Sequence, residues 1–401
     1  MPTHMRLYTE EFAAEPRRYF DDLRGQHGAA AQVHLAAGVP ATLVIGYREA
    51  LHVLSDSDRF PTDHRAWQSA LPDDCPVLPI MEWGPANSDS DERSRTRGAY
   101  LTAIDGIDLH ALRAAVEAAA VPLINSFCGS GSADLLGSYA RPLTTHVLDE
   151  LLGFPPDSRR MIHTAMSVLT ETADPEIANQ GEQLIRKTVG EIVTAKRHAP
   201  ANDMISRLLT HPAGFDDAEV VEQVAELYVM GSEPTWNLIV NALLSMATDP
   251  QFHDDLLSGT LLVRDAIDAV LFLDPPVRNG CPRFPRQPQI IGNVWLPADQ
   301  PVVISLTACN NDPAVGGDRA GNRSHLAFGA GEHSCPAQSV ATLIAQEAID
   351  QLLDALPEIA LAVPIEELSW HPSTFHRAPV AVPVTFPPSP PLTFLQGAEP
   401  R

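Results

Sequence analysis

Apolar residues recur along most of this chain with the spacing of one helix face. Helical periodicity dominates from Leu109 to about residue 273, and a first helix is expected over residues 16–25. A later helix is marked by apolar residues that stand four positions apart, namely Val340, Ile344, Ala348 and Leu352. The pattern therefore predicts a mainly α-helical fold.

A smaller part of the chain has the composition of β-strands. Residues 33–46 are rich in β-branched side chains and contain a Gly-Val-Pro turn, which indicates a hairpin. Residues 290–306 also read as strands, with a turn over 296–299. A short helix is expected over 48–56. Residues 57–104 carry prolines and then a charged run, so we expect an irregular loop there, and a loop of that length is usually functional or mobile.

The chain of 401 residues shows no internal repeat and no long linker. We therefore expect one domain over residues 1–386. Residues 387–401 are rich in proline, and we expect them to form a disordered tail.

Composition then narrows the possible partners. The net charge of −24 argues against binding to nucleic acid or to an anionic membrane. Apolar runs are too short to span a bilayer, and the first residues lack the pattern of a signal peptide. The five cysteines are scattered without a Cys-x-x-Cys pair, which fits reduced thiols in a cytoplasm and argues against a zinc site.

One short stretch carries the strongest chemical signal. Residues 328–337 read Phe-Gly-Ala-Gly-Glu-His-Ser-Cys-Pro-Ala, a glycine-rich loop that ends in a cysteine before a helix. Gly329 and Gly331 permit positive φ and close approach to a flat ligand. The free amides at the start of the helix favour the thiolate of Cys335, which is the form that ligates a metal. A lone cysteine in this place is otherwise a buried structural residue.

The whole stretch resembles the haem-ligating loop of the cytochrome P450 family, with Ala337 where glycine is more usual. The resemblance covers roughly residues 16–386 and implies that the thiolate of Cys335 is the axial ligand of a haem b iron. It also implies that Phe328 shields the sulfur and that Gly331 belongs to the haem-binding loop. By the same resemblance, His333 and His325 lie near the haem propionates.

Two arginines complete the set of cofactor contacts that the resemblance implies. Arg113 follows Leu112 in a segment that resembles the family's helix at the haem edge, so it is expected to pair with a propionate. Arg283 matches the family's arginine that follows a Pro-Pro-Val segment. The alternative for both arginines is an ion pair at the surface.

The central helix departs from the family pattern. Residues 230–239 resemble the oxygen-activating segment, in which an acid is followed directly by threonine. Glu233 occupies the acid position, Pro234 stands in place of the threonine, and Thr235 carries a hydroxyl one position later. Because proline lacks an N–H group, it should kink the helix and open it locally. Glu233 is expected either to deliver protons or to be a solvated helix carboxylate.

A second departure concerns the family's buried Glu-x-x-Arg pair. Aligned on Pro275 and Pro276, the pair falls on Ala269 and Phe272. Removing a whole buried charge network can be nearly neutral, so we expect apolar packing around Phe272 in its place. The joint departures resemble an atypical subgroup of actinobacterial members of the family.

The resemblance implies a haem-thiolate oxidoreductase that oxidises a small organic molecule, by monooxygenation or oxidative coupling, with electrons from a ferredoxin and its reductase. A thiolate ligand favours O–O cleavage. Two alternatives remain open because of Pro234 and the missing charge pair. One is a peroxide-dependent haem enzyme, and the other is a catalytically impaired haem-binding protein with a regulatory or scaffold role.

Overall fold

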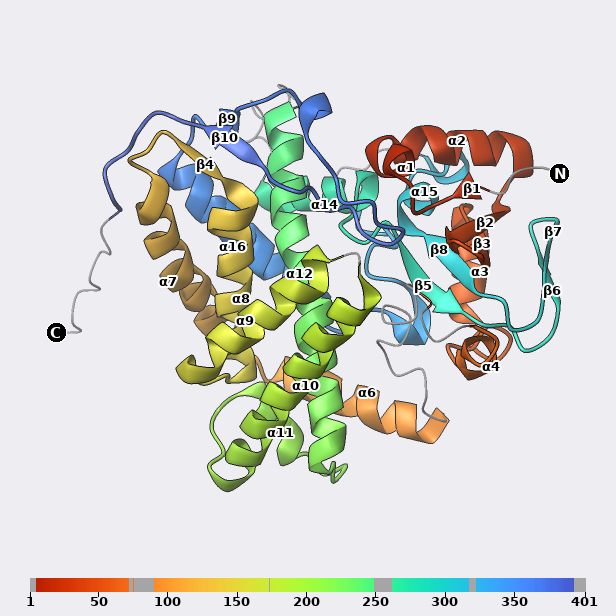
Figure 1. Ribbon diagram of the computed structural model, residues 1–401, viewed down its shortest axis with the longest axis horizontal. Coiled ribbons are helices and arrows are strands. Elements are labelled where there is room, and N and C mark those ends of the chain that lie inside the picture. The colour runs from red at the N-terminus through yellow and green to blue at the C-terminus, as the bar shows by residue number, and fades with distance from the viewer. Residues whose placement is uncertain are drawn as a thin grey trace.

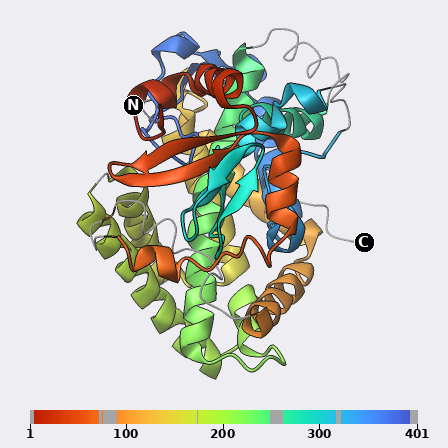
Figure 2. The same cartoon turned by 90° about the vertical axis from the view of Figure 1, so that its right-hand side faces the viewer.

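Helix α12 (Asp217–Thr248) is 32 residues long and runs through the middle of the molecule (Figure 1). The structure is a computed structural model, and it describes residues 5–71, 75, 90–172, 174–248, 262–316 and 322–392. Helices surround α12 on one side, and a β-sheet with the N-terminal helices lies on the other side. Seen after a quarter turn, the sheet stands in front of α12 (Figure 2).

The helical part confirms the mainly α prediction. The helices that pack on or near α12 are α6 (Ser90–Asp105), α7 (Leu109–Phe127), α8 (Arg141–Leu152), α9 (Pro156–Glu171), α10 (Pro175–His198), α11 (Met204–Leu209), α14 (Val263–Leu273) and α16 (Gln338–Ala355). A π-helical turn over Leu136–Ala140 leads directly into α8. No helix within the described ranges is both long enough and apolar enough to cross a membrane.

The main sheet has five strands in the order β1-β2-β3-β8-β5. These strands are β1 (Met5–Arg6), β2 (Ala30–Ala36), β3 (Val39–Val44), β5 (Asn279–Arg283) and β8 (Val302–Ser305). The predicted hairpin is confirmed as β2 and β3, which pair antiparallel around a turn where Gly38 has φ of 78°. Strands β3 and β8 are parallel, so chain segments far apart in sequence meet in this sheet.

The shorter elements complete the β part and the N-terminal region. The two smaller sheets are formed by β4 (Ser132–Asp134), β9 (Ala360–Leu361) and β10 (Pro383–Thr385), and by β6 (Gln289–Ile291) and β7 (Val294–Leu296). The remaining helices are α1 (Glu10–Ala14), α2 (Pro16–His27), α3 (Tyr47–Ser55), α4 (Arg65–Gln68), α15 (Leu306–Asn310) and the 3₁₀ turns Pro313–Val315, Gly331–His333 and Ile365–Glu367. The predicted strands over 290–306 are confirmed, with one more turn at Gly292.

One expectation about irregular chain needs correction. The interval 57–104 contains α4 and the 16-residue helix α6, although residues 72–74 and 76–89 lie outside the described residues. Helix α6 begins in the charged run, and its polar sequence has no apolar stripe that hydropathy could reveal.

The disordered tail over residues 387–401 stays a prediction. Within it, the backbone of Leu392 exchanges hydrogen bonds with the Asn125 side chain on α7. Residues 393–401 lie outside the description.

The end of α14 contains a buried aromatic residue and a charge contact. Phe272 is buried, and its ring meets the His325 ring edge-on at 5.3 Å between centroids. The apolar packing around Phe272 that the sequence predicts stays a prediction, because this contact is with an imidazole. Four residues before Phe272, buried Asp268 accepts a 2.9 Å hydrogen bond from Arg323 and lies 3.3 Å from Arg264.

Candidate active site

The glycine-rich loop folds back on itself in front of α16. Gly329 N–H donates to the Leu326 carbonyl at 2.8 Å, and Cys335 N–H donates to the Phe328 carbonyl at 2.8 Å. Gly331 has φ of 71°, and a Cβ atom there would lie 2.4 Å from the carbonyl oxygen of Leu54. Only glycine fits that position without moving the backbone of α3, so the loop's glycines are explained by both dihedral angle and space.

The protein around Cys335 disfavours the ionised form of its thiol. The residue is accessible to solvent, and yet desolvation by the surrounding protein raises the pKa of its thiol. The Ala337 N–H and the Arg97 guanidinium act in the opposite direction but do not outweigh desolvation. The start of the helix therefore does not by itself lower the pKa of this thiol, in contrast to the expectation from the sequence.

His325 carries a feature that fits a missing acidic ligand. Its ring is buried beside Phe272 and Phe328, and neither ring nitrogen has a hydrogen-bond partner within the described structure. Burial lowers the pKa of His325, and nearby Asp268 only partly opposes that effect. A buried imidazole normally makes a hydrogen bond, so an absent acceptor such as a carboxylate is the simplest explanation.

Arg283 is brought to the same loop by β5. It is 2% exposed, and one amino group donates to the Pro282 carbonyl at 2.9 Å. The neighbouring Cys281 sulfur lies 3.4 Å from the position that a Gly329 Cβ would occupy, which places the end of β5 against the loop. Because Arg283 is buried, the alternative of an ion pair at the surface is excluded for it.

His333 is also in the loop, where its Nε2 lies 3.2 Å from the Glu332 carboxylate.

Arg113, by contrast, does not lie with the other predicted contacts. Its Nε lies 3.2 Å from Glu347 on α16, and half of its side chain is exposed. Glu347 is twelve residues after Cys335 and most of that distance is helix, so this ion pair is on the order of 15 Å along α16 from the loop. The surface ion pair, which was the alternative for Arg113, is what the structure shows.

Arg97 on α6 occupies the place that the sequence assigned to Arg113. Its guanidinium donates to the Ser334 carbonyl at 2.7 Å and acts electrostatically on Cys335. The sequence did contain a signal for Arg97. Arg93 and Arg97 stand four residues apart, which is the spacing of one helix face. The prediction of an irregular loop over residues 57–104 hides this spacing. A thiol, four nearby guanidinium or imidazole groups and two loop glycines without a Cβ atom together suit a flat group that carries carboxylates.

Glu233 is not a solvated carboxylate. Its Oε1 lies 3.1 Å from Nδ1 of His376, and each side chain is about four-fifths buried, at 19% exposure. Desolvation by itself would raise the pKa of Glu233 and lower that of His376. The mutual attraction and hydrogen bond are stronger, so the pKa of Glu233 is lowered and that of His376 is raised. The pair is therefore an ion pair between α12 and the C-terminal segment.

The three residues that follow Glu233 on α12 differ in their role in the helix and in their contacts. Helix α12 continues through Pro234 without ending. Thr235 and Trp236 are buried, and the guanidinium of Arg141 lies 5.2 Å from the centre of a Trp236 ring. Because Trp236 packs in the core against α8, it does not face solvent in an open cavity.

Known proteins resemble this chain over most of its length, although no protein-family model matches it. Cytochrome P450-SU2 of Streptomyces griseolus is 30% identical over 290 residues, which are 70% of this chain and 72% of the relative. Cytochrome P450 monooxygenase PikC of Streptomyces venezuelae is 27% identical over 387 residues, which are 94% of this chain and 92% of that protein.

Solved structures agree with these relatives. CYP154C4 from Streptomyces sp. ATCC 11861 superposes with a TM-score of 0.88 at 26% sequence identity, and the match covers 97% of this chain and 100% of that one. The similarity therefore extends over the helical part and the sheets together.

Proposed function

Since the chain belongs to the cytochrome P450 family and is a P450-type oxidoreductase, we propose that it binds haem b through Cys335 and oxidises a small organic molecule with electrons from a ferredoxin and its reductase. The observation that supports the proposal most directly is the accessible but desolvated Cys335 thiol in a loop built on Gly329 and Gly331. The substrate class that we favour is a secondary metabolite, because one relative is named mycinamicin IV hydroxylase/epoxidase.

The residues around Cys335 have distinct roles in this proposal. Arg97, Arg283 and His325 bind the propionates, and His325 gains the hydrogen bond that its buried ring lacks. Phe328 covers the sulfur, and Gly331 lets the loop lie against α3. When bound, haem supplies the activation of dioxygen.

Glu233 is the acid that we assign to proton delivery. Its ion pair with His376 keeps it ionised, so it accepts a proton from the C-terminal segment before it can pass one on. Pro234 supplies no hydroxyl, and Thr235 is buried one position later. Pro234 instead leaves the Met230 carbonyl without its helical donor, and that carbonyl becomes an acceptor beside Glu233.

Two further functions remain candidates because of Pro234 and the absent Glu-x-x-Arg pair. In one, peroxide replaces dioxygen and the electron supply. In the other, the protein binds haem as a regulator or scaffold and does not turn over. The buried Glu233–His376 pair favours an enzyme, because two desolvated charges have no evident use in a scaffold.

Reconstitution with a ferredoxin system separates these cases, since steady electron consumption driven by a bound ligand excludes a scaffold.

The first experiment is the absorption spectrum of the reduced protein under carbon monoxide. We expect a red-shifted Soret band of the thiolate–CO kind in the wild type and in Cys281→Ser, a control that removes the neighbouring thiol. Cys335→Ser should lose the band. Folded, haem-supplied protein that binds no haem, or a Cys335→Ser variant that keeps the band, contradicts the proposal.

A further inference from the structure

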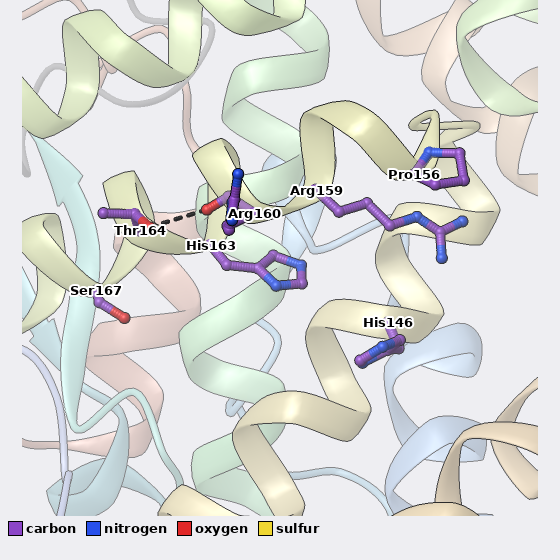
Figure 3. A pocket seen from close by; sticks show the side chains of 7 residues that line it. All are labelled: His146, Pro156, Arg159, Arg160, His163, Thr164 and Ser167. Carbon is purple, nitrogen blue, oxygen red and sulfur yellow. Dashed lines mark hydrogen bonds between the residues drawn. The ribbon is translucent and has the colours of Figure 1, made fainter.

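A recess lies between α8 and α9, on elements that carry none of the predicted haem contacts (Figure 3). Its volume is about 460 Å³, within the range of sites for small molecules. The polar residues of its lining are His146 from α8 and Arg159, Arg160, His163, Thr164 and Ser167 from α9. Among the described residues, no carboxylate lines it, on a chain that has 51 acidic and 27 basic residues.

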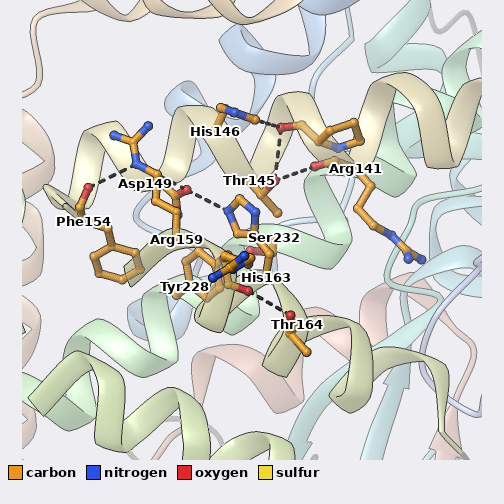
Figure 4. A network of polar contacts seen from close by, with 12 residues as sticks. Arg141, Thr145, His146, Asp149, Phe154, Arg159, His163, Thr164, Tyr228 and Ser232 are labelled. Carbon is orange, nitrogen blue, oxygen red and sulfur yellow. Dashed lines mark hydrogen bonds and ion pairs between the residues drawn. The ribbon is translucent and has the colours of Figure 1, made fainter. Parts of the chain in front are cut away.

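The two imidazoles of this recess are held in fixed orientations. His146 Nδ1 donates to the Pro142 carbonyl at 2.7 Å, and His163 Nε2 donates to Asp149 at 2.7 Å (Figure 4). Asp149 is fully buried behind His163. The ring centroids are 6.0 Å apart. Each ring therefore has its second nitrogen left for a ligand, and little side-chain freedom is lost when one binds. That nitrogen accepts a hydrogen bond in the neutral ring and donates one only in the imidazolium, so an anionic ligand binds the imidazolium form of each ring.

The arginines supply permanent positive charge to the same space. Arg159 Nε donates to the Phe154 carbonyl at 3.3 Å and lies 3.8 Å from Asp149, so its charge is partly balanced. Arg160 is exposed, and its guanidinium makes no hydrogen bond or ion pair with any described residue. In Figure 3, Arg159 and His163 project from α9 toward the space above His146.

These groups favour an oxyanion over a metal ion. Two fixed imidazoles resemble a pair of metal ligands, but two guanidinium groups beside them repel a cation. Among the described residues, no three His, Cys, Asp or Glu side chains come together in a way that could hold a metal ion. A phosphate group, with three terminal oxygens, can use more of these donors than a carboxylate can.

We propose that this recess binds the phosphate group of a small organic phosphate monoester. The phosphate lies between Arg160, His146 and His163, and the rest of the molecule occupies space that inorganic phosphate would leave empty. Such a ligand joins α8 to α9. Because Arg141 at the start of α8 contacts both Trp236 on α12 and Glu171 at the end of α9, the ligand also steadies the helices beside Glu233.

The test is calorimetric titration of the haem-loaded, full-length protein with inorganic phosphate and with ribose 5-phosphate, in buffer free of other oxyanions. We expect saturable binding of both, with ribose 5-phosphate tighter. Arg160→Gln and His146→Gln should each raise the Kd about tenfold, the range expected for loss of a charge-assisted hydrogen bond. Both side chains are exposed, so the substitutions should not disturb folding.

Arg48→Gln is the matched control, because Arg48 on α3 is likewise exposed and has no hydrogen-bond or ion-pair partner among the described residues. It removes the same charge and should leave the Kd within about twofold of wild type. Equal weakening by Arg48→Gln and Arg160→Gln overturns the site, because it reveals only general attraction of anions. Absence of saturable binding, or Zn²⁺ binding that depends on His146 while phosphate does not bind, overturns it as well.

Discussion

Arg97 and Arg113 show how two arginines of similar sequence context are separated by the fold. Arg97 reaches the Ser334 carbonyl beside Cys335, whereas Arg113 pairs with Glu347 farther along α16. The sequence predicted the need for a cation near the loop but assigned it to the wrong helix. Spacing along a chain cannot tell which of two neighbouring helices points its polar face at a loop that lies more than 200 residues away.

We expect Arg97→Gln to speed loss of haem to apomyoglobin about tenfold, because a charge-assisted hydrogen bond to a propionate is removed. Arg113→Gln is the control, and its rate should stay within about twofold of wild type because an exposed ion pair contributes little. Equal rates for the two variants would mean that Arg97 does not contact the cofactor.

For Glu233 we expect two distinct effects on turnover with a reconstituted ferredoxin system. Glu233→Gln should lower the fraction of electrons that reach product about tenfold or more, because a positioned acid is lost. His376→Gln keeps the carboxylate but removes its counter-charge, so desolvation then raises the pKa of Glu233 and the acidic limb of the pH–rate profile moves to higher pH. A profile that does not move would show that the pair has no part in proton transfer.

At the scale of elements, the loop before α16 depends on its contact with α3. Gly331 combines positive φ with a 2.4 Å approach of any Cβ to Leu54, whereas Gly28 has φ of 78° in open space. We expect Gly28→Ala to lower the free energy of unfolding by about 2 kcal/mol, the cost of a backbone conformation with φ of 78° and ψ of −127° that residues with a Cβ atom rarely adopt. Gly331→Ala should cost about 3 kcal/mol or more, since backbone must also move. Urea denaturation measures both, and equal costs would refute the close contact.

Elements differed in how well the sequence predicted them. The hairpin of β2 and β3 and the helices after residue 109 have strong apolar periods and were predicted. Helix α6 was missed because it is largely polar and is stabilised where it packs against α11, including a hydrogen bond from Arg207 to the carbonyl of Ala103 on α6. The prolines of residues 387–392 predict a disordered segment, and the contact of Leu392 with the distant Asn125 side chain could not be predicted from them.

At the scale of the whole molecule, buried acids should make stability depend on pH. Desolvation raises the pKa of Glu226 from 4.5 to about 7, although a hydrogen bond from Tyr100 opposes it. Desolvation also raises the pKa of Asp350 to about 6. Between pH 4.5 and 7 the folded protein binds a proton at Glu226 that the unfolded chain has released, so stability decreases as pH rises through this window.

We expect the wild type to be more stable at pH 5 than at pH 7.5. Glu226 should contribute about 2 kcal/mol of the difference, because its side chain is partly exposed and solvent screens part of the effect. Glu226→Gln should flatten the dependence, and Glu191→Gln, which replaces an exposed acid on α10, should leave it unchanged. Urea midpoints across this pH range decide the matter, and a wild-type slope retained in Glu226→Gln would contradict the assignment.

The sequence alone determined the helical class, the main hairpin, the cysteine loop and its resemblance to a P450 ligand loop, because these depend on local spacing and on residue types that few other structures require. Tertiary structure decided which arginine faces Cys335, that Glu233 pairs with His376, and that Asp268 retains a charge contact near the lost pair. Each of these contacts joins residues that are distant in sequence. Packing and desolvation determine which residues meet, and local sequence patterns contain no information about either.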